Sequence, residues 1–162
     1  MDAPLVAPAR GAALDLAMGR GRHALLLARA GFRTYGVDRD FAAVRDAMIA
    51  AAAEGLALIG WCADLTMHPL PESRFDVIIV ARYLQRDLFP AIRAALRPGG
   101  VVLYETFTFE QRSHARGPTS ADHLLEAGEL RRHFEGLDEL FYEEVSAPEA
   151  LARIVARRTN RS

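Results

Sequence analysis

The residues of this sequence best suited to bind a polar ligand are two aspartates that flank a pair of glycines. Asp15 lies in a short apolar run, Gly19 and Gly21 follow it, and Asp38 comes 19 positions after Gly19. Glycine lets the backbone bend sharply and lets a ligand approach without a Cβ atom in its way. An acid at the position of Asp38 can accept hydrogen bonds from both hydroxyls of a ribose. The carboxylate of Asp15 suits a ligand with positive charge, because it would repel a pyrophosphate.

These residues must be positioned by a strand, a turn, a helix and a second strand. The apolar pattern predicts a strand over 12–16, a helix over 24–30 that stops at Gly31, and a strand over 34–37. Such a helix presents unpaired N–H groups toward a ligand at the turn. Two structural alternatives stay open: Asp15 could cap the glycine turn, and Asp38 could be a solvated turn acid.

Residues 19–24 also fit the G-x-G-x-x-G/A pattern of dinucleotide-binding proteins. This match alone is weak, but it keeps a nicotinamide-dependent oxidoreductase as an alternative. Asp15 and the short chain argue against that alternative, since the chain leaves no room for a separate substrate domain.

A longer segment carries a resemblance to a known family. The run Leu14-Asp15-Leu16-Ala17-Met18-Gly19-Arg20-Gly21-Arg22-His23 resembles the first motif of the class I S-adenosylmethionine (SAM)-dependent methyltransferases. Met18 replaces the common Cys at a position that contributes chiefly backbone. Arg97-Pro98-Gly99-Gly100 resembles the loop before the fifth strand of the same family. The Gly-Arg-His continuation, with Tyr-Glu-Thr-Phe at 104–107 and Gly117-Pro118, is similar to the small bacterial methyltransferases of the tellurite-resistance type.

The resemblance implies SAM as cofactor and transfer of its methyl group to a small-molecule acceptor, with release of S-adenosylhomocysteine. The subgroup suggests a metalloid oxyanion or a small thiol as acceptor. Asp64 would receive the adenine amino group, and Arg22 and His23 could contact the carboxylate of the cofactor. The expected cofactor-binding residues are Asp15, Ala17, Met18, Gly19, Gly21, Arg22, His23, Asp38, Arg39, Asp64, Leu65, Arg82 and Leu84.

No catalytic residue is assigned, because direct displacement at a methyl carbon depends mainly on alignment of the reactants. Tyr83, Glu105 and Phe107 lie near the expected carboxyl ends of strands and could line the acceptor pocket, although Phe107 could equally belong to the core. The polar segment 107–125 is predicted as a flap in which His114 and Arg116 would meet the substrate. A non-catalytic SAM-binding module that acts with a partner remains an alternative.

The expected fold is α/β, a single-domain doubly wound Rossmann-like sheet of about seven strands, with the last strands antiparallel. One domain would span 1–162, with an extended lead-in over 1–11 and no helix before the first strand. Three alternatives follow: the site is open, another subunit of a homo-oligomer closes it, or the chain is a truncated form. The further expected elements are a helix capped by Asp40 and ended by Gly55, strands over 57–61, 75–80 and 101–106, helices over 88–96 and 128–134, and strands over 137–145 and 151–157 with a turn at Pro148.

Composition excludes several classes of partner. The 20 basic residues, all arginine, nearly balance 21 acidic residues for a net charge of -1, which predicts neither nucleic acid nor a membrane as partner. Cys62 is the only cysteine and the histidines lack ligand spacing, so we expect no disulfide and no metal site. A cytoplasmic protein without a signal peptide is predicted.

Overall fold

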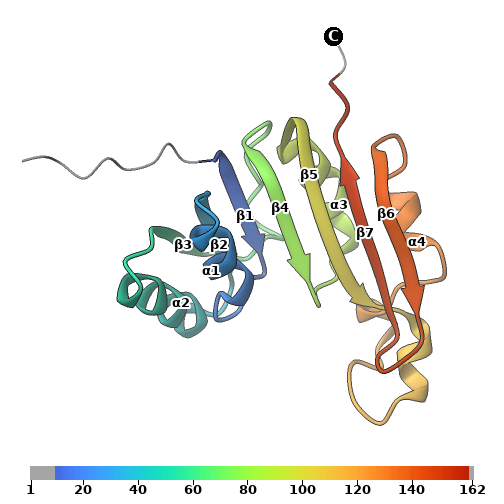
Figure 1. The fold of residues 1–162 in the computed structure, drawn as a ribbon. Coiled ribbons are helices and arrows are strands. Elements are labelled where there is room, and N and C mark those ends of the chain that lie inside the picture. Colours follow the sequence, from blue (N-terminus) through green and yellow to red (C-terminus); the bar gives the residue numbers. More distant parts are fainter. Residues whose placement is uncertain (1–9, 161–162) are drawn as a thin grey trace, which may run out of the picture.

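The computed structural model of the chain describes residues 10–160, so most of the expected lead-in lies outside the described residues. Its centre is a seven-stranded sheet with the order β3-β2-β1-β4-β5-β7-β6 (Figure 1). The strands are β1 (Ala12–Leu16), β2 (Arg33–Asp38), β3 (Leu58–Cys62), β4 (Phe75–Ala81), β5 (Leu96–Phe107), β6 (Asp138–Val145) and β7 (Leu151–Arg157). Strands β1 to β5 are parallel, and β7 runs antiparallel to both of its neighbours. The predicted fold class is confirmed.

Helices cover both faces of this sheet. Helices α1 (Arg22–Arg29) and α2 (Phe41–Ala53) pack on β1, β2 and β3, whereas α3 (Phe89–Ala95) and α4 (Glu129–His133) lie behind β5 and β7 (Figure 1). Three short 3-10 turns complete the set: η1 (Arg86–Leu88), η2 (Phe109–Ser113) and η3 (Ala121–His123). In residues 10–160, no helix has both the length and the apolar character needed to cross a membrane.

The core lies mainly between the central strands and α3. All five residues of β1 are buried, as expected for a parallel strand covered on both faces. Phe89 of α3 stacks on Tyr104 of β5, with ring centroids 5.1 Å apart, and meets the edge of Phe134. This packed core holds the central strands in place, and with them the carboxyl ends of those strands.

Turn chemistry sets the start of each of the first two helices. Gly19 and Gly21 have φ values of 54° and 81°, which side chains with a Cβ atom rarely adopt, and α1 begins directly after them. Asp40 caps α2 by accepting hydrogen bonds from the N–H groups of Ala42 and Ala43. The glycine turn and the Asp40 cap therefore form as the sequence predicts, although α1 begins two residues earlier than expected.

One expected turn is instead an irregular part of a strand. Arg97–Gly100 was predicted as a loop before a strand at 101–106, but β5 already begins at Leu96 and its register with β4 shifts there. Gly99 takes a φ of 80°, and its N–H donates to the carbonyl of Arg158. The N–H of Arg158 in turn donates to the carbonyl of Gly100, so this segment is tied to the chain after β7. No local signal in the sequence reveals that pairing.

Candidate functional site

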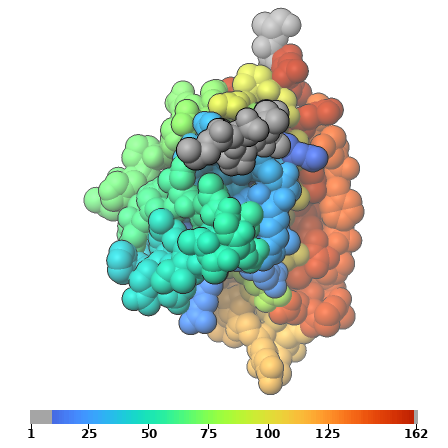
Figure 2. Space-filling model, turned by 60° about the vertical axis from the view of Figure 1, so that its left-hand side comes forward, coloured from blue at the N-terminus to red at the C-terminus, as the bar shows by residue number. Residues whose placement is uncertain are grey.

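A cavity of about 560 Å³ lies at the carboxyl ends of the parallel strands. Open α/β sheets bind ligands at this edge, where the strand order reverses. In Figures 1 and 2 the light-orange segment 107–125 lies at this same lower end of the molecule. The cavity is lined by residues that follow β1 to β4, by the end of β5, and by two residues of that segment: Ala17, Asp38, Arg39, Ala63, Asp64, Leu65, Thr66, Arg82, Tyr83, Leu84, Gln85, Thr106, Phe107, Pro118 and His123.

Seven of the thirteen residues expected to bind the cofactor line this cavity, namely Ala17, Asp38, Arg39, Asp64, Leu65, Arg82 and Leu84. The other six, Asp15, Met18, Gly19, Gly21, Arg22 and His23, belong to the glycine turn, the strand before it and the start of α1, and are not in the cavity wall. The site is therefore formed chiefly by strand ends.

Asp38 links the glycine turn to the cavity. Its Oδ2 accepts a hydrogen bond of 2.9 Å from the N–H of Gly19, and its Oδ1 accepts one of 2.9 Å from the N–H of Asp40. A carboxylate offers about four lone-pair sites, so each oxygen can accept one more hydrogen bond. Nothing lies within 4 Å of the position a Cβ atom would take on Gly19, which leaves open space beside the carboxylate. This arrangement fits a ligand with two hydroxyl groups.

Asp64 presents a second carboxylate on the same wall. Its Oδ1 accepts hydrogen bonds from the N–H of Thr66 at 2.9 Å and from the hydroxyl of Thr66 at 2.7 Å. These two bonds lower the pKa of the carboxyl, which keeps it ionised. They also hold Oδ1, and Oδ2 is left to accept a hydrogen bond from an amino group of a ligand.

Asp15 takes the structural role that the sequence left open. Its Oδ2 accepts a hydrogen bond of 2.8 Å from the N–H of Ala24, and only 1 % of the residue is exposed. Burial raises the pKa of this carboxyl to about 7, against the lowering effect of the Ala24 bond. Asp15 thus supports the start of α1 from below the glycine turn.

The turn itself is closely packed against its neighbours. The side chain of Met18 is buried against Gly36, where a Cβ atom would collide with its sulfur, and a Cβ atom on Gly21 would lie 2.8 Å from that of Ala47. Burial lowers the pKa of His23, with Arg22 beside it acting in the same direction. Met18 thus packs the turn against β2, whereas Arg20 and Arg22 are exposed.

Two residues of the cavity wall have an unusual backbone. Ala17 and Arg82 follow β1 and β4 directly and have φ values of 57° and 55°. Residues with a side chain seldom adopt this left-handed conformation, and where they do they are often part of a functional site. Both neighbouring strands thus turn sharply at the point where the cavity begins.

The β4–β5 side of the cavity is shaped by hydrogen bonds and ion pairs between side chains. The hydroxyl of Tyr83 donates to Gln85, and that of Tyr104 donates to the carbonyl of Tyr83 at 2.7 Å. Arg82 pairs with Glu149 through two hydrogen bonds of 3.1 and 2.5 Å, and its guanidinium lies 5.2 Å from the ring of Phe107.

The residues expected near an acceptor differ in their position relative to the cavity. Tyr83 and Phe107 line the cavity, whereas Glu105, His114 and Arg116 do not. Glu105 is bound by Arg153 at 2.5 Å instead. Six further residues line the cavity that the sequence does not indicate: Ala63, Thr66, Gln85, Thr106, Pro118 and His123.

Those omissions have different causes. Thr106 could have been found, because it ends the predicted strand beside Phe107. His123 gave no signal, since its place depends on the path of segment 107–125, which Arg86 fixes by donating to the carbonyl of Leu124 at 2.8 Å. Among residues 10–160, no three His, Cys, Asp or Glu side chains gather in a way that could hold a metal ion.

The strand order, the antiparallel β7 and the carboxylates at the ends of β2 and β3 together define a class I methyltransferase fold. A family model described as "Methyltransferase domain" matches residues 13–100, which is more than half of the chain. The chain therefore belongs to this family and is a SAM-dependent methyltransferase with SAM as its cofactor. No curated protein matches the sequence.

Solved structures agree on the fold. A protein studied for the conversion of a disulfide bond into a thioacetal group during echinomycin biosynthesis is 24 % identical, with a TM-score of 0.74, over 94 % of this chain and 77 % of that one. A SAM-dependent methyltransferase from Mesorhizobium loti is 19 % identical, with a TM-score of 0.75, over 93 % and 92 %. TehB from Haemophilus influenzae is 18 % identical, with a TM-score of 0.77, over 92 % of this chain but 58 % of TehB.

Proposed function

We propose that the acceptor of the methyl group is a small molecule that binds at the β4–β5 end of the 560 Å³ cavity. One observation carries this proposal: a single cavity extends from Asp38 and Asp64 to Phe107 and His123. Its volume falls in the range of roughly 300 to 1,000 Å³ that is typical of small-molecule sites. A folded protein or a nucleic-acid duplex would not fit inside it.

The cofactor is assigned to the end of the cavity at β2 and β3. Asp38 would accept hydrogen bonds from the ribose hydroxyls, since both of its oxygens keep a lone pair after binding Gly19 and Asp40. Asp64 would accept one from the adenine amino group through Oδ2. The N–H groups of the glycine turn and the start of α1 would lie near the amino acid part of the cofactor.

The acceptor is assigned to the opposite end because of the sheet order. Strands β1 and β4 separate β2 from β5, so Phe107 and His123 lie across the cavity from Asp38. Phe107 and Pro118 offer apolar contact, and Thr106, Gln85 and His123 offer hydrogen bonds. This mixture suits a small acceptor that is partly apolar and carries a nucleophilic atom.

The bound cofactor supplies an electrophilic methyl group, which an acceptor nucleophile takes in one displacement. The chain's own contribution is to align the two reactants, and alignment alone can lower a barrier by roughly 7 to 11 kcal/mol. His123 is the titratable side chain of the cavity best suited to accept a proton from an acceptor thiol or hydroxyl. A nucleophile that already carries a free lone pair needs no such base.

The test combines cofactor binding with an acceptor screen. Calorimetric titration with SAM, S-adenosylhomocysteine and NAD should show saturable binding of the first two only. Release of S-adenosylhomocysteine is then measured with small thiols, metalloid oxyanions and phenols, alongside RNA and a protein mixture. Turnover on a small molecule supports the proposal, whereas turnover only on RNA or protein contradicts it. Binding without turnover on any acceptor would favour the non-catalytic alternative.

Two variants locate the acceptor within the cavity. Phe107→Ala and His123→Ala should lower turnover and leave the affinity for S-adenosylhomocysteine within about threefold, because both side chains lie away from Asp38 and Asp64. His114→Ala, whose side chain is outside the cavity wall, serves as the matched control. Equal turnover in all three variants would refute the placement of the acceptor.

A further inference from the structure

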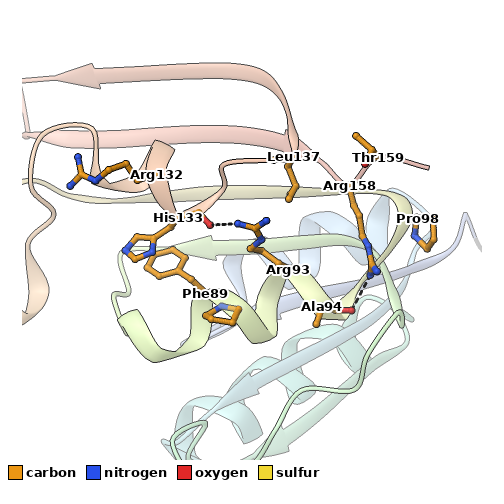
Figure 3. Close-up of a pocket in the computed structure, with 11 residues that line it drawn as sticks. Phe89, Arg93, Ala94, Pro98, Arg132, His133, Leu137, Arg158 and Thr159 are labelled. Atoms are coloured by element: carbon orange, nitrogen blue, oxygen red, sulfur yellow. Dashed lines mark hydrogen bonds between the residues drawn. The ribbon is translucent and has the colours of Figure 1, made fainter. Parts of the chain in front are cut away.

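A second cavity, of about 700 Å³, lies on the far side of the sheet from α1 and α2. It is bounded by α3, α4 and the chain that follows β7 (Figure 3), and it shares no lining residue with the methyltransferase site. Pro90, Pro98 and Leu137 provide apolar contacts on its wall. Three arginines line it, Arg93, Arg132 and Arg158, and its lining contains no aspartate or glutamate.

Two of these arginines stand apart from the others in the chain. In residues 10–160, five arginines are half-buried, and three of them pair with carboxylates: Arg86 with Glu129, Arg97 with Asp76, and Arg153 with Glu105 and Glu143. The other two are Arg93 and Arg158, which form no ion pair with any residue in that range. Half-buried charges normally have a partner of opposite charge, because removing a charge from water is costly. Both exceptions line the same cavity.

Backbone carbonyls orient both guanidinium groups. Arg93 donates through Nη1 to the carbonyl of His133 at 2.9 Å, and Arg158 donates through Nη1 to the carbonyls of Ala94, at 3.2 Å, and Leu96. Figure 3 shows the first two of these bonds, and it shows the side chain of Arg132 pointing away from them. Within the described residues, Nε and Nη2 of both arginines donate to no acceptor. Donors held in place before a ligand arrives lose little entropy when it binds.

We propose that this cavity binds a small molecule that carries a phosphate or carboxylate group, through the guanidinium groups of Arg93 and Arg158. The planar donor fork of arginine matches the oxygens of either group and binds them in pairs. A small ligand is favoured over nucleic acid because the positive charge lies inside a cavity and the whole chain has a net charge of -1.

The experiment is a nuclear magnetic resonance titration of the full chain at low ionic strength, followed through the Arg Nε–H signals. Pyrophosphate and citrate are added in separate titrations. We expect saturable shifts of the Arg93 and Arg158 signals with at least one of the two anions. Saturation by pyrophosphate alone identifies phosphate as the group recognised, and saturation by citrate alone identifies carboxylate.

Variants decide whether the anion binds in this cavity. Arg93→Gln and Arg158→Gln should each weaken binding about tenfold or more, because each removes a charge-assisted contact. Arg33→Gln removes an exposed arginine from β2 and should leave the affinity unchanged. Because Arg158 also binds carbonyls at the end of α3, Arg158→Lys is a second variant that keeps the charge, and thermal unfolding reports whether each variant folds. Arg158→Lys should bind more weakly than the original chain but better than Arg158→Gln.

Several results would overturn the proposal. If binding of neither anion reaches saturation below about 10 mM, the affinity is negligible. The two arginines would then serve only to bind backbone carbonyls. Equal weakening by Arg33→Gln would show that binding is unspecific. Tighter binding of a single-stranded RNA oligomer than of either anion would make nucleic acid the ligand.

Discussion

Two buried carboxylates, Asp15 and Glu129, show how differently the two sides of this molecule are built. They are 1 % and 7 % exposed, respectively, and burial acts to raise the pKa of both. For Asp15, beneath the glycine turn, one N–H donor is not enough to offset burial, and the pKa rises to about 7. For Glu129, the hydrogen bonds from Arg86, the N–H of Glu126 and His133 outweigh burial and lower the pKa to about 2.

The same contrast extends to the surroundings of each residue. On the β1–β3 side, Asp15, Asp38 and Asp64 all accept hydrogen bonds from backbone N–H groups, which belong to helix α1, the glycine turn and the loop after β3, respectively. On the other side, carboxylates bind arginines that are distant in sequence: Glu129 and Arg86 are 43 positions apart, and Glu149 and Arg82 are 67 apart. The β1–β3 side, to which we assign the cofactor, is therefore shaped by backbone donors, and the β4–β5 side, to which we assign the acceptor, depends on long-range ion pairs.

Asp15→Asn should show the largest effect, as a dependence of stability on pH. An acid whose pKa is raised in the folded state, here from 3.8 to about 7, makes the folded state less stable as pH rises through that interval. The amide oxygen of Asn can still accept from Ala24, and it carries no charge. The stability of the variant relative to the original chain should therefore rise by up to about 1.4 kcal/mol for each pH unit between 4 and 7.

Urea unfolding at pH 4, 5, 6, 7 and 8 measures this difference. A constant offset is expected from the change of group, so the slope with pH is the informative quantity. A flat difference across this range would show that the pKa of Asp15 is not raised, and the contrast with Glu129 would fail.

Glu129→Gln should destabilise the β4–β5 side by roughly 1 to 3 kcal/mol at pH 7, between the values for exposed and buried pairs, because the half-buried Arg86 loses its counter-charge. The stability that Glu129 contributes is fully present above its ordinary pKa of 4.5 and is lost as pH falls toward 2. The difference between variant and original chain should thus shrink below pH 4.5. Chemical unfolding at pH 7 and pH 3.5 checks both statements.

Glu139→Gln is the matched control for this change. Glu139 also binds an arginine, Arg131, but both side chains are largely exposed, so its loss should cost clearly less stability than the loss of Glu129. Hydrogen exchange should show faster opening of 107–125 in Glu129→Gln only, because Arg86 also holds the carbonyl of Leu124. Equal effects of the two variants would mean that the buried pair does not organise this side.

The contrast between local backbone contacts and long-range ion pairs explains how much of the molecule can be predicted from the sequence. The glycine turn, the Asp40 cap and the strands other than β5 depend on local patterns, and they form within one residue of where the sequence places them. Asp38 is the last residue of β2 and Asp64 comes two residues after β3, so their presence in the cavity wall could be predicted. His123 and the register shift at Gly99 depend on contacts with Arg86 and Arg158 that are remote in sequence. Local patterns carry no information about such contacts.

The hydrogen-bond partners of Asp15 and Glu105 are equally hard to predict from the sequence. The sequence leaves open whether Asp15 faces a ligand or caps the turn, and it gives no sign that the carboxyl is buried and accepts from the N–H of Ala24. Glu105 was a candidate for the acceptor pocket, but Arg153 from the antiparallel strand β7 binds it. Glu105 and Arg153 are 48 positions apart, and only the pairing of β5 with β7 brings them together.

Asp38→Ala should have the smallest effect on stability and a clear effect on cofactor binding. Asp38 lies between Asp15 and Glu129, because it accepts from two backbone N–H groups and from no arginine in residues 10–160. It also lines the cavity. If its remaining lone pairs bind the ribose, the variant should bind SAM and S-adenosylhomocysteine about tenfold to somewhat over a hundredfold more weakly. Calorimetric titration measures the change, with Asp46→Ala on the outer part of α2 as the control.

A loss of affinity could also arise because Gly19 and Asp40 lose the acceptor that shapes the turn. Asp38→Asn separates the two causes, since its amide oxygen can still accept from one of these N–H groups while its charge is gone. If the ribose hydroxyls bind the carboxylate, Asp38→Asn should also lose affinity, although less than Asp38→Ala. Undiminished affinity in Asp38→Ala would refute the ribose assignment, and would leave the cofactor side dependent on the glycine turn and Asp64 alone.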